Sequence, residues 1–227
     1  PQKFERANYG GFLEGFYYQK NSYIMLVYLD GSGVIEIFAD THALGHAQFA
    51  PDDSTILSFC HEGPWNYVQQ RIWLLDIVSR KVKPCFRQTS EDDCVGHECW
   101  TRNGLIFFDN RRRGHDGTIT SDRMQAVALE QAVSDPDQIP YVGFADKSGE
   151  VIKKIELPYY CNHYHINGDN TLLVGDGVDN IVLINVKNQP SALMPLCYHG
   201  TSWRYHHTHC HPTWSWDGSK ILFTSDR

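Results

Sequence analysis

Histidines are concentrated near the C-terminal end of the sequence, in a pattern that suits a metal ion. Five of the twelve histidines fall between His199 and His211. Side chains two residues apart share a face of an extended chain, so His209 and His211 can approach one ion together, and His207 extends the row. Neutral imidazole is a ligand for Zn, Mn, Fe, Cu and Ni. The alternative interpretation is a surface loop that binds no metal.

Other histidines and one arginine stand close to apolar runs that are typical of strands. His163 and His165 form a second His-x-His pair, and His97 lies in the segment Gly96-His97-Glu98-Cys99-Trp100. A neutral histidine such as His97 suits a general base near neutral pH. A structural histidine that bonds a neighbouring element is an equally good interpretation. Arg71 directly precedes an apolar run. It is either a solvated charge or, if the strands are arranged around a central axis, a cation that faces this axis.

These side chains need elements to position them, and the sequence predicts mainly β-strands. Short apolar runs alternate with Asp, Asn, Gly and Pro, which are turn residues. The runs expected to form strands are 16–18, 23–29, 34–38, 56–59, 72–77, 105–108, 141–144, 151–155, 171–174 and 181–184. One short helix is expected near Ser121–Val133, which is rich in Ala, Leu, Glu and Gln and is followed by Asp135-Pro136-Asp137.

An internal repeat identifies the expected architecture. Four segments have the order strand, polar turn, apolar strand; they are 46–59, 100–108, 165–174 and 211–224. Their starts lie roughly 45–65 residues apart, and a four-stranded propeller blade takes about 40–50 residues. We therefore expect an all-β protein with a single β-propeller domain over residues 1–227, interrupted by the short helix. A β-sandwich also has short strands but does not explain the repeat. This length supplies about five blades.

Composition excludes some classes of protein. The chain has 20 Lys and Arg against 27 Asp and Glu, a net charge of -7, so a general nucleic-acid binder is not expected. No window approaches the roughly 18 apolar residues of a membrane span, so no membrane partner is expected. The seven cysteines are odd in number and scattered, which favours reduced thiols in a cytoplasmic protein. Motifs of serine hydrolases, P-loop enzymes and His-Glu-x-x-His metalloproteases are missing from the sequence.

The ends of the sequence predict that it is part of a longer protein. It begins at Pro1 without an initiator Met, and no secretory signal follows. It ends in an apolar, strand-like run at 221–223, only a few residues before Arg227. We therefore expect an incomplete propeller.

Taken together, the motifs resemble those of oligogalacturonate lyases, the propeller-type pectin lyases. The resemblance runs from about Leu44 to the C-terminus and rests on the segments 59–65, 70–74 and 96–100, on His163 followed by 175–177, and on 209–212 before Asp217-Gly218. The family has a seven-bladed propeller of greater length. The resemblance therefore agrees with a piece of about five blades.

The resemblance implies a metal site near the central channel. The family holds a divalent ion, usually manganese, with three His and one Gln. In this sequence the residues that correspond to the three His ligands of the family are His163, His209 and His211, and His206 stands at the position of the Gln. We expect Mn²⁺ as the cofactor, with Zn²⁺ or another divalent ion as alternatives. The catalytic base of the family corresponds to His97 and its catalytic arginine to Arg71.

The implied activity is a metal-dependent β-elimination on oligogalacturonides, which are pectin fragments and anionic uronate oligosaccharides. The base removes the C5 proton of a uronate, the C4–O4 bond breaks, and the product is a 4,5-unsaturated uronide. Further expected substrate contacts are His61, Trp65, His115 and Arg204. Two alternatives remain open: a propeller lyase for another uronate-containing oligosaccharide, and a propeller that only binds a ligand or partner.

Overall fold

The fold consists almost entirely of antiparallel strands. The structure is a computed structural model that describes residues 15–16, 18–63, 67–112, 133, 135–187, 191–203 and 208–227. The strands are β1 (Ser22–Val27), β2 (Val34–Asp40), β3 (Ala43–Ala50), β4 (Asp53–Glu62), β5 (Ile72–Asp76), β6 (Lys81–Pro84), β7 (Val95–Trp100), β8 (Ile106–Asn110), β9 (Tyr141–Ala145), β10 (Val151–Glu156), β11 (Tyr164–Ile166), β12 (Leu172–Asp176), β13 (Asn180–Asn185), β14 (Leu193–Tyr198), β15 (Thr213–Trp214) and β16 (Ile221–Leu222). A 3₁₀ helix, η1 (Pro136–Gln138), precedes β9.

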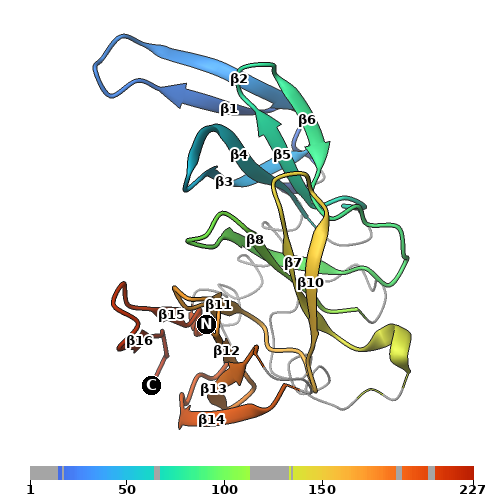
Figure 1. Cartoon of the computed structure of the whole chain (residues 1–227), viewed down its shortest axis with the longest axis vertical. Coiled ribbons are helices and arrows are strands. Elements are labelled where there is room, and N and C mark those ends of the chain that lie inside the picture. The colour runs from blue at the N-terminus through green and yellow to red at the C-terminus, as the bar shows by residue number, and fades with distance from the viewer. Residues whose placement is uncertain are drawn as a thin grey trace.

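The described strands form five sheets, each built from strands that follow one another in the sequence. Three sheets have four strands, in the orders β3-β4-β5-β6, β7-β8-β9-β10 and β11-β12-β13-β14. Two-stranded sheets, β1-β2 and β15-β16, lie at the two ends of this series. Figure 1 shows the sheets following one another from the blue hairpin to the red one. The first strands of neighbouring sheets touch, because β3 contacts β7 and β11 contacts β15.

The hydrophobic cores lie between successive sheets. Ile106 and Phe108 on β8 pack with Ile72 and Leu74 of the preceding sheet. The residue between them, Phe107, faces the other way and packs with strands β12 and β13 of the following sheet. Because side chains alternate along a strand, β8 is apolar on both faces and joins two cores. Sheets packed face to face in series, with their first strands innermost, are the blades of a β-propeller.

The strand order confirms the expected all-β propeller. The four repeated segments correspond to the first two strands of four consecutive sheets, β3–β4, β7–β8, β11–β12 and β15–β16. Two strands were not expected, namely β6 and β14, and each contains a proline. The expected strand at 16–18 is wrong, because Phe16 and Tyr18 are helical. The expected helix near 121–133 lies outside the described residues, apart from Val133, which is not helical.

The described residues contain no helix that is both long enough and apolar enough to cross a membrane. All seven cysteines are free thiols, and only Cys197 is exposed.

A glycine on β9 sets the packing of the central sheet and gives a first prediction. Gly143 lies opposite Phe108, and a Cβ at this position would come within 2.2 Å of the Phe108 ring. The Phe108 ring is completely buried and stacks on the ring of Phe86, at 4.8 Å between centroids, so moving it would disturb the core. Gly143→Ala should therefore lower the free energy of unfolding by about 1–3 kcal/mol in urea denaturation.

Gly168→Ala is the matched control for this prediction. The three atoms nearest to a Cβ on Gly168 belong to the guanidinium of Arg102, which is the far end of an exposed side chain. Its effect should stay within about 0.5 kcal/mol. Equal unfolding midpoints for the two variants would contradict the packing described for Phe108.

Candidate metal centre

Three of the expected metal ligands converge at one place. His163 lies just before β11, and His209 and His211 lie just before β15, so two neighbouring blades supply them. Each offers one ligand atom, and these atoms all lie within 4.8 Å of one another. The ring centroids of His163 and His211 are 3.6 Å apart, and those of His163 and His209 are 5.7 Å apart. We refer to His163, His209 and His211 as the histidine triad.

The triad is open on one side and enclosed on the other. His163 and His209 are buried, at 7% and 1% exposure, whereas His211 is exposed. The indole ring of Trp203, itself buried, lies 5.1 Å from the ring of His209. An ion held here would keep a face for an external ligand next to His211.

The backbone explains why His209 and His211 converge, and the reason differs from the one expected. Neither residue lies in a strand, and His211 has φ of 43°, in the left-handed region that is uncommon for residues other than glycine. The alternation of side chains along an extended chain therefore does not bring them together. Backbone strain of this kind is concentrated at functional sites.

A buried carboxylate orients His163. Asp176, the last residue of β12, accepts the backbone N–H of His163 at 2.6 Å and faces its Nδ1 at 2.8 Å. Burial raises the pKa of Asp176 to about 6, although the neighbouring imidazoles lower it. The Asn162 amide lies 3.4 Å from Nδ1 of His209. Because a carboxylate only accepts hydrogen bonds, Nδ1 of His163 is the donor to Asp176, and Nε2 is the nitrogen of this ring that is suited to binding a metal ion.

His97 lies beside the triad. It belongs to β7, the first strand of the preceding blade, and its ring centroid is 4.7 Å from that of His163. Its Nδ1 is 3.2 Å from the carboxylate of Asp109, which is completely buried on β8. The His97 side chain is 41% exposed, so it remains accessible to a ligand.

Arg71 lies in a dense network of charges. Its Nε donates to Glu98 at 2.9 Å and its Nη2 donates to Glu62 at 3.1 Å, and the guanidinium is nearly buried. His46 completes the network, with Nδ1 at 2.6 Å from Glu98 and Nε2 at 3.2 Å from Glu62. Its hydrogen bond to Glu98 raises the pKa of His46 although burial lowers it, which favours a protonated ring that offsets the second carboxylate.

His61 belongs to a different cluster, at the end of β4. Its ring stacks on that of His42 with centroids 4.4 Å apart, and its Nε2 is 3.3 Å from Asp40. Burial lowers the pKa of His61, so the ring is neutral near pH 7. Four other expected site residues lie outside the described residues: Trp65, His115, Arg204 and His206.

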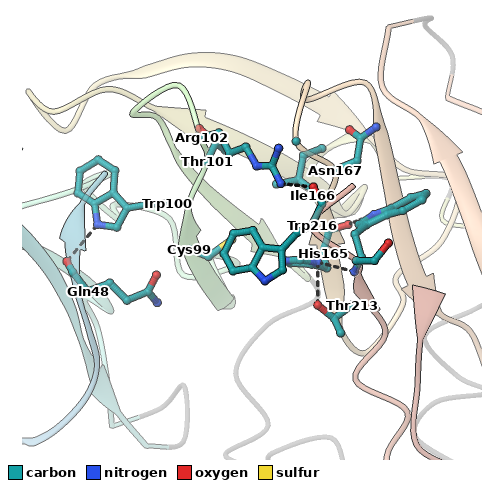
Figure 2. Close-up of a pocket in the computed structure, with 13 residues that line it drawn as sticks. Gln48, Cys99, Trp100, Thr101, Arg102, His165, Ile166, Asn167, Thr213 and Trp216 are labelled. Atoms are coloured by element: carbon teal, nitrogen blue, oxygen red, sulfur yellow. Dashed lines mark hydrogen bonds between the residues drawn. The ribbon is translucent and has the colours of Figure 1, made fainter. Parts of the chain in front are cut away.

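A cavity of about 480 Å³ lies at the opposite ends of the innermost strands. Figure 2 shows Trp100, Trp216 and Arg102 among the side chains that line it. Apart from Gln48 on β3, the lining residues come from the ends of β7, β11 and β15 and the turns that follow, whereas the triad precedes β11 and β15. The cavity is therefore separate from the triad, and none of the expected site residues lines it.

Comparison with known proteins identifies the family. The model of the family described as oligogalacturonate lyase matches residues 6–134, which is more than half of the chain. The chain belongs to the oligogalacturonate lyase family. The triad and the whole region that follows residue 134 lie beyond the matched segment, so the assignment of the triad depends on the geometry given above.

Individual relatives agree with this membership in the oligogalacturonate lyase family. The chain is 26% identical to an oligogalacturonide lyase of Pectobacterium atrosepticum and 27% identical to an oligogalacturonate lyase of Dickeya dadantii. Each alignment covers 84% of this chain and 48% of the relative. The chain thus spans about half the length of the curated relatives that it matches.

Solved structures of the same family share the fold. An oligogalacturonate lyase in complex with manganese superposes with a TM-score of 0.75 and 25% identity, covering 96% of this chain and 54% of that protein. An oligogalacturonate lyase from Vibrio parahaemolyticus has a TM-score of 0.76 at 24% identity, covering 99% of this chain and 57% of that protein.

The sequence expectations missed the acidic residues around the histidines, namely Asp109, Asp176, Glu62 and Glu98. The repeat contained a sign of three of them. In each of three copies the second, apolar strand ends in or near an acid: Glu62 on β4, Asp109 on β8 and Asp176 on β12. An alignment of the three copies that extends past their apolar residues shows this shared acidic position.

Proposed function

We propose that this chain is part of a metal-dependent oligogalacturonate lyase that cleaves pectin fragments by β-elimination. The observation that carries the proposal is the convergence of His163, His209 and His211 beside the accessible His97. The family relatives named above support the substrate class. We propose a cytoplasmic location, since most of the free cysteines are buried thiols.

The donor set of the triad fits a divalent transition metal. Three neutral imidazoles suit manganese, zinc and their neighbours better than calcium or magnesium, which prefer oxygen ligands. We propose Mn²⁺, because a relative of the same fold is a manganese complex. His163, His209 and His211 would hold the ion, with His206 as the proposed fourth ligand. A bound divalent ion supplies positive charge for the substrate carboxylate, which makes the adjacent proton easier to remove.

The proposed roles of the protein side chains follow from their positions. His97 takes the C5 proton on Nε2, because its Nδ1 faces the carboxylate of Asp109. Arg71 is the proposed cation for the substrate carboxylate. Glu62, whose side chain is 24% exposed, is the partner that the substrate would displace from it. His61, Trp65, His115 and Arg204 remain the proposed substrate contacts.

The activity is tested by incubating the chain with oligogalacturonides and Mn²⁺ and following ultraviolet absorbance of the unsaturated product. Absorbance should rise, and a chelator should stop the rise. His97→Ala should lower the rate by about 10²–10⁴-fold at saturating Mn²⁺.

Three outcomes of this experiment contradict parts of the proposal. No absorbance rise with any divalent metal would exclude the lyase, and binding without cleavage would favour a non-catalytic propeller. A rise only with other uronate polymers, such as ulvan or rhamnogalacturonan fragments, would exclude oligogalacturonide as the substrate. Full activity of His97→Ala would exclude this base.

A further inference from the structure

Two neighbouring blades hold a histidine in the same way. Asp109 and Asp176 occupy equivalent places near the ends of β8 and β12, the second strands of their blades. Asp176 accepts the backbone N–H of His163 at 2.6 Å and faces its Nδ1 at 2.8 Å. Asp109 accepts the backbone N–H of His97 at 3.1 Å and faces its Nδ1 at 3.2 Å. In both pairs one carboxylate fixes the main chain and the ring of one histidine.

The surroundings of Asp109 are built to keep its carboxylate in this place. Tyr160 donates its buried hydroxyl to Oδ1 at 2.9 Å, which leaves Oδ2 for His97. A Cβ on Gly96 would lie 2.3 Å from Oδ1, so only glycine fits beside this carboxylate. Asp109 and Asp176 are 0% and 1% exposed, so water does not compete for them.

A carboxylate at Nδ1 decides which ring nitrogen carries the proton. An ionised aspartate only accepts hydrogen bonds, so the facing Nδ1 carries the proton and donates it. In a neutral imidazole Nε2 is then unprotonated, with its lone pair free. His163 needs that lone pair to bind a metal ion, and His97 needs it to accept a proton from a substrate.

A histidine on the preceding blade shows the effect of a second carboxylate. His46 faces Glu98 through Nδ1 and Glu62 through Nε2, so both ring nitrogens donate to carboxylates. This ring has no lone pair for a metal or a proton. The single aspartate per ring is therefore what distinguishes His97 and His163 from His46.

We propose that Asp176 and Asp109 are two positioning residues with separate tasks, the first for the metal ligand His163 and the second for the base His97. This inference rests on the proposed function for the task of Asp109. The task of Asp176 requires only metal binding. Each aspartate acts through its histidine and touches neither the metal nor the substrate.

Asparagine variants separate the two tasks. Asp176→Asn should weaken Mn²⁺ binding by about 10–100-fold in calorimetric titration, and excess Mn²⁺ should restore most of the turnover. Asp109→Asn should leave Mn²⁺ affinity within about twofold and lower kcat by about 10²-fold or more, without rescue by Mn²⁺. KM should change little in Asp109→Asn, because the aspartate does not touch the substrate.

A matched control removes a buried aspartate whose partners among the described residues include no histidine. Asp93 is 4% exposed and bonds Asn110 and Arg112 in the same blade as Asp109. Asp93→Asn should change stability only, leaving Mn²⁺ affinity and kcat as in the wild type. Equal losses of Mn²⁺ affinity and kcat in all three variants would overturn the proposal in favour of a purely structural role.

Ring-nitrogen NMR of the wild-type chain tests the proposal without any variant. Long-range ¹H–¹⁵N correlations should show the proton of His97 and His163 on Nδ1 in the metal-free protein. A proton on Nε2 of either ring would overturn the assignment for that pair. This readout and the Mn²⁺ titration do not depend on turnover, so they remain decisive if the lyase activity itself is missing.

Discussion

Replacing His209 with alanine should weaken Mn²⁺ binding by at least ~100-fold. His209 is the most buried member of the triad, at 1% exposure, and it is enclosed by Trp203 and His163. The ion would therefore lose one of the three imidazoles of the triad. Isothermal titration of Mn²⁺ into the metal-free chain measures the effect directly.

Thermal unfolding gives a second measurement of the same prediction. A ligand that binds only the folded state stabilises it by an amount that increases with its concentration relative to Kd. Mn²⁺ should therefore raise the Tm of the wild type and leave the Tm of His209→Ala almost unchanged.

His165→Ala is the control for this pair of measurements. His165 forms the other half of the His-x-His pair with His163, but its Nδ1 accepts the N–H of Trp214 at 3.0 Å. Its loss should reduce stability and preserve Mn²⁺ affinity. Unchanged Mn²⁺ affinity in His209→Ala, or equal losses in both variants, would exclude the triad as the metal site.

The sequence predicted the chemistry of this centre better than its geometry. The types and spacing of His209 and His211 indicated a metal site, and the structure brings both next to His163. The expected cause was an extended strand, whereas the actual cause includes a left-handed backbone at His211. Local pattern cannot predict such a conformation, because it is stable only when the surrounding fold imposes it.

The strands that sequence analysis missed have a common physical reason. β6 and β14 are the outermost strands of their blades, where one edge faces away from the sheet. Prolines such as Pro84 and Pro195 are tolerated there, because an edge strand does not need every N–H for the ladder. Polar or exposed residues are common in such edge strands for the same reason. β6 and β14 therefore lack the continuous apolar runs that identified β4, β8 and β12.

The charge network around Arg71 could not be predicted from the sequence pattern either. Arg71, Glu62, Glu98 and His46 come from β3, β4, β7 and the segment before β5, and only the packing of two blades brings them together. A lone arginine before a strand gives no indication of two carboxylate partners in different elements. Because this network is buried, the loss of Arg71 should strongly lower the stability of the fold.

Arg71→Ala should lower the free energy of unfolding by about 3–5 kcal/mol, because it leaves two carboxylates close together without their main cation. Glu98 is the more costly of the two, since its side chain is 1% exposed. Urea denaturation of the wild type and the variant at pH 7 measures the difference. A change below about 1 kcal/mol would contradict the buried network and would favour an arginine that is free for other contacts.

The double variant Arg71→Met with Glu98→Gln distinguishes lost charge balance from lost packing. It removes one cation and one buried anion together, so the remaining Glu62 and His46 can pair. Replacing a buried ion pair by groups of similar volume is often neutral in stability. The double variant should therefore recover at least half of the loss seen in Arg71→Ala, and a loss equal to the single variant would indicate packing alone.

The pH dependence of the same stability difference checks its electrostatic origin. Burial alone would raise the pKa of Glu98, but the charges of Arg71 and His46 outweigh it and lower the pKa from 4.5 to about 2. A carboxyl group whose pKa is lowered by folding stabilises the protein above its unfolded pKa, and this contribution disappears as the pH falls toward the folded value. The difference between wild type and Arg71→Ala should thus be largest above about pH 5 and shrink toward pH 2. A difference that stays constant across this range would mean that Arg71 stabilises the blade interface through its apolar stem rather than through its charge.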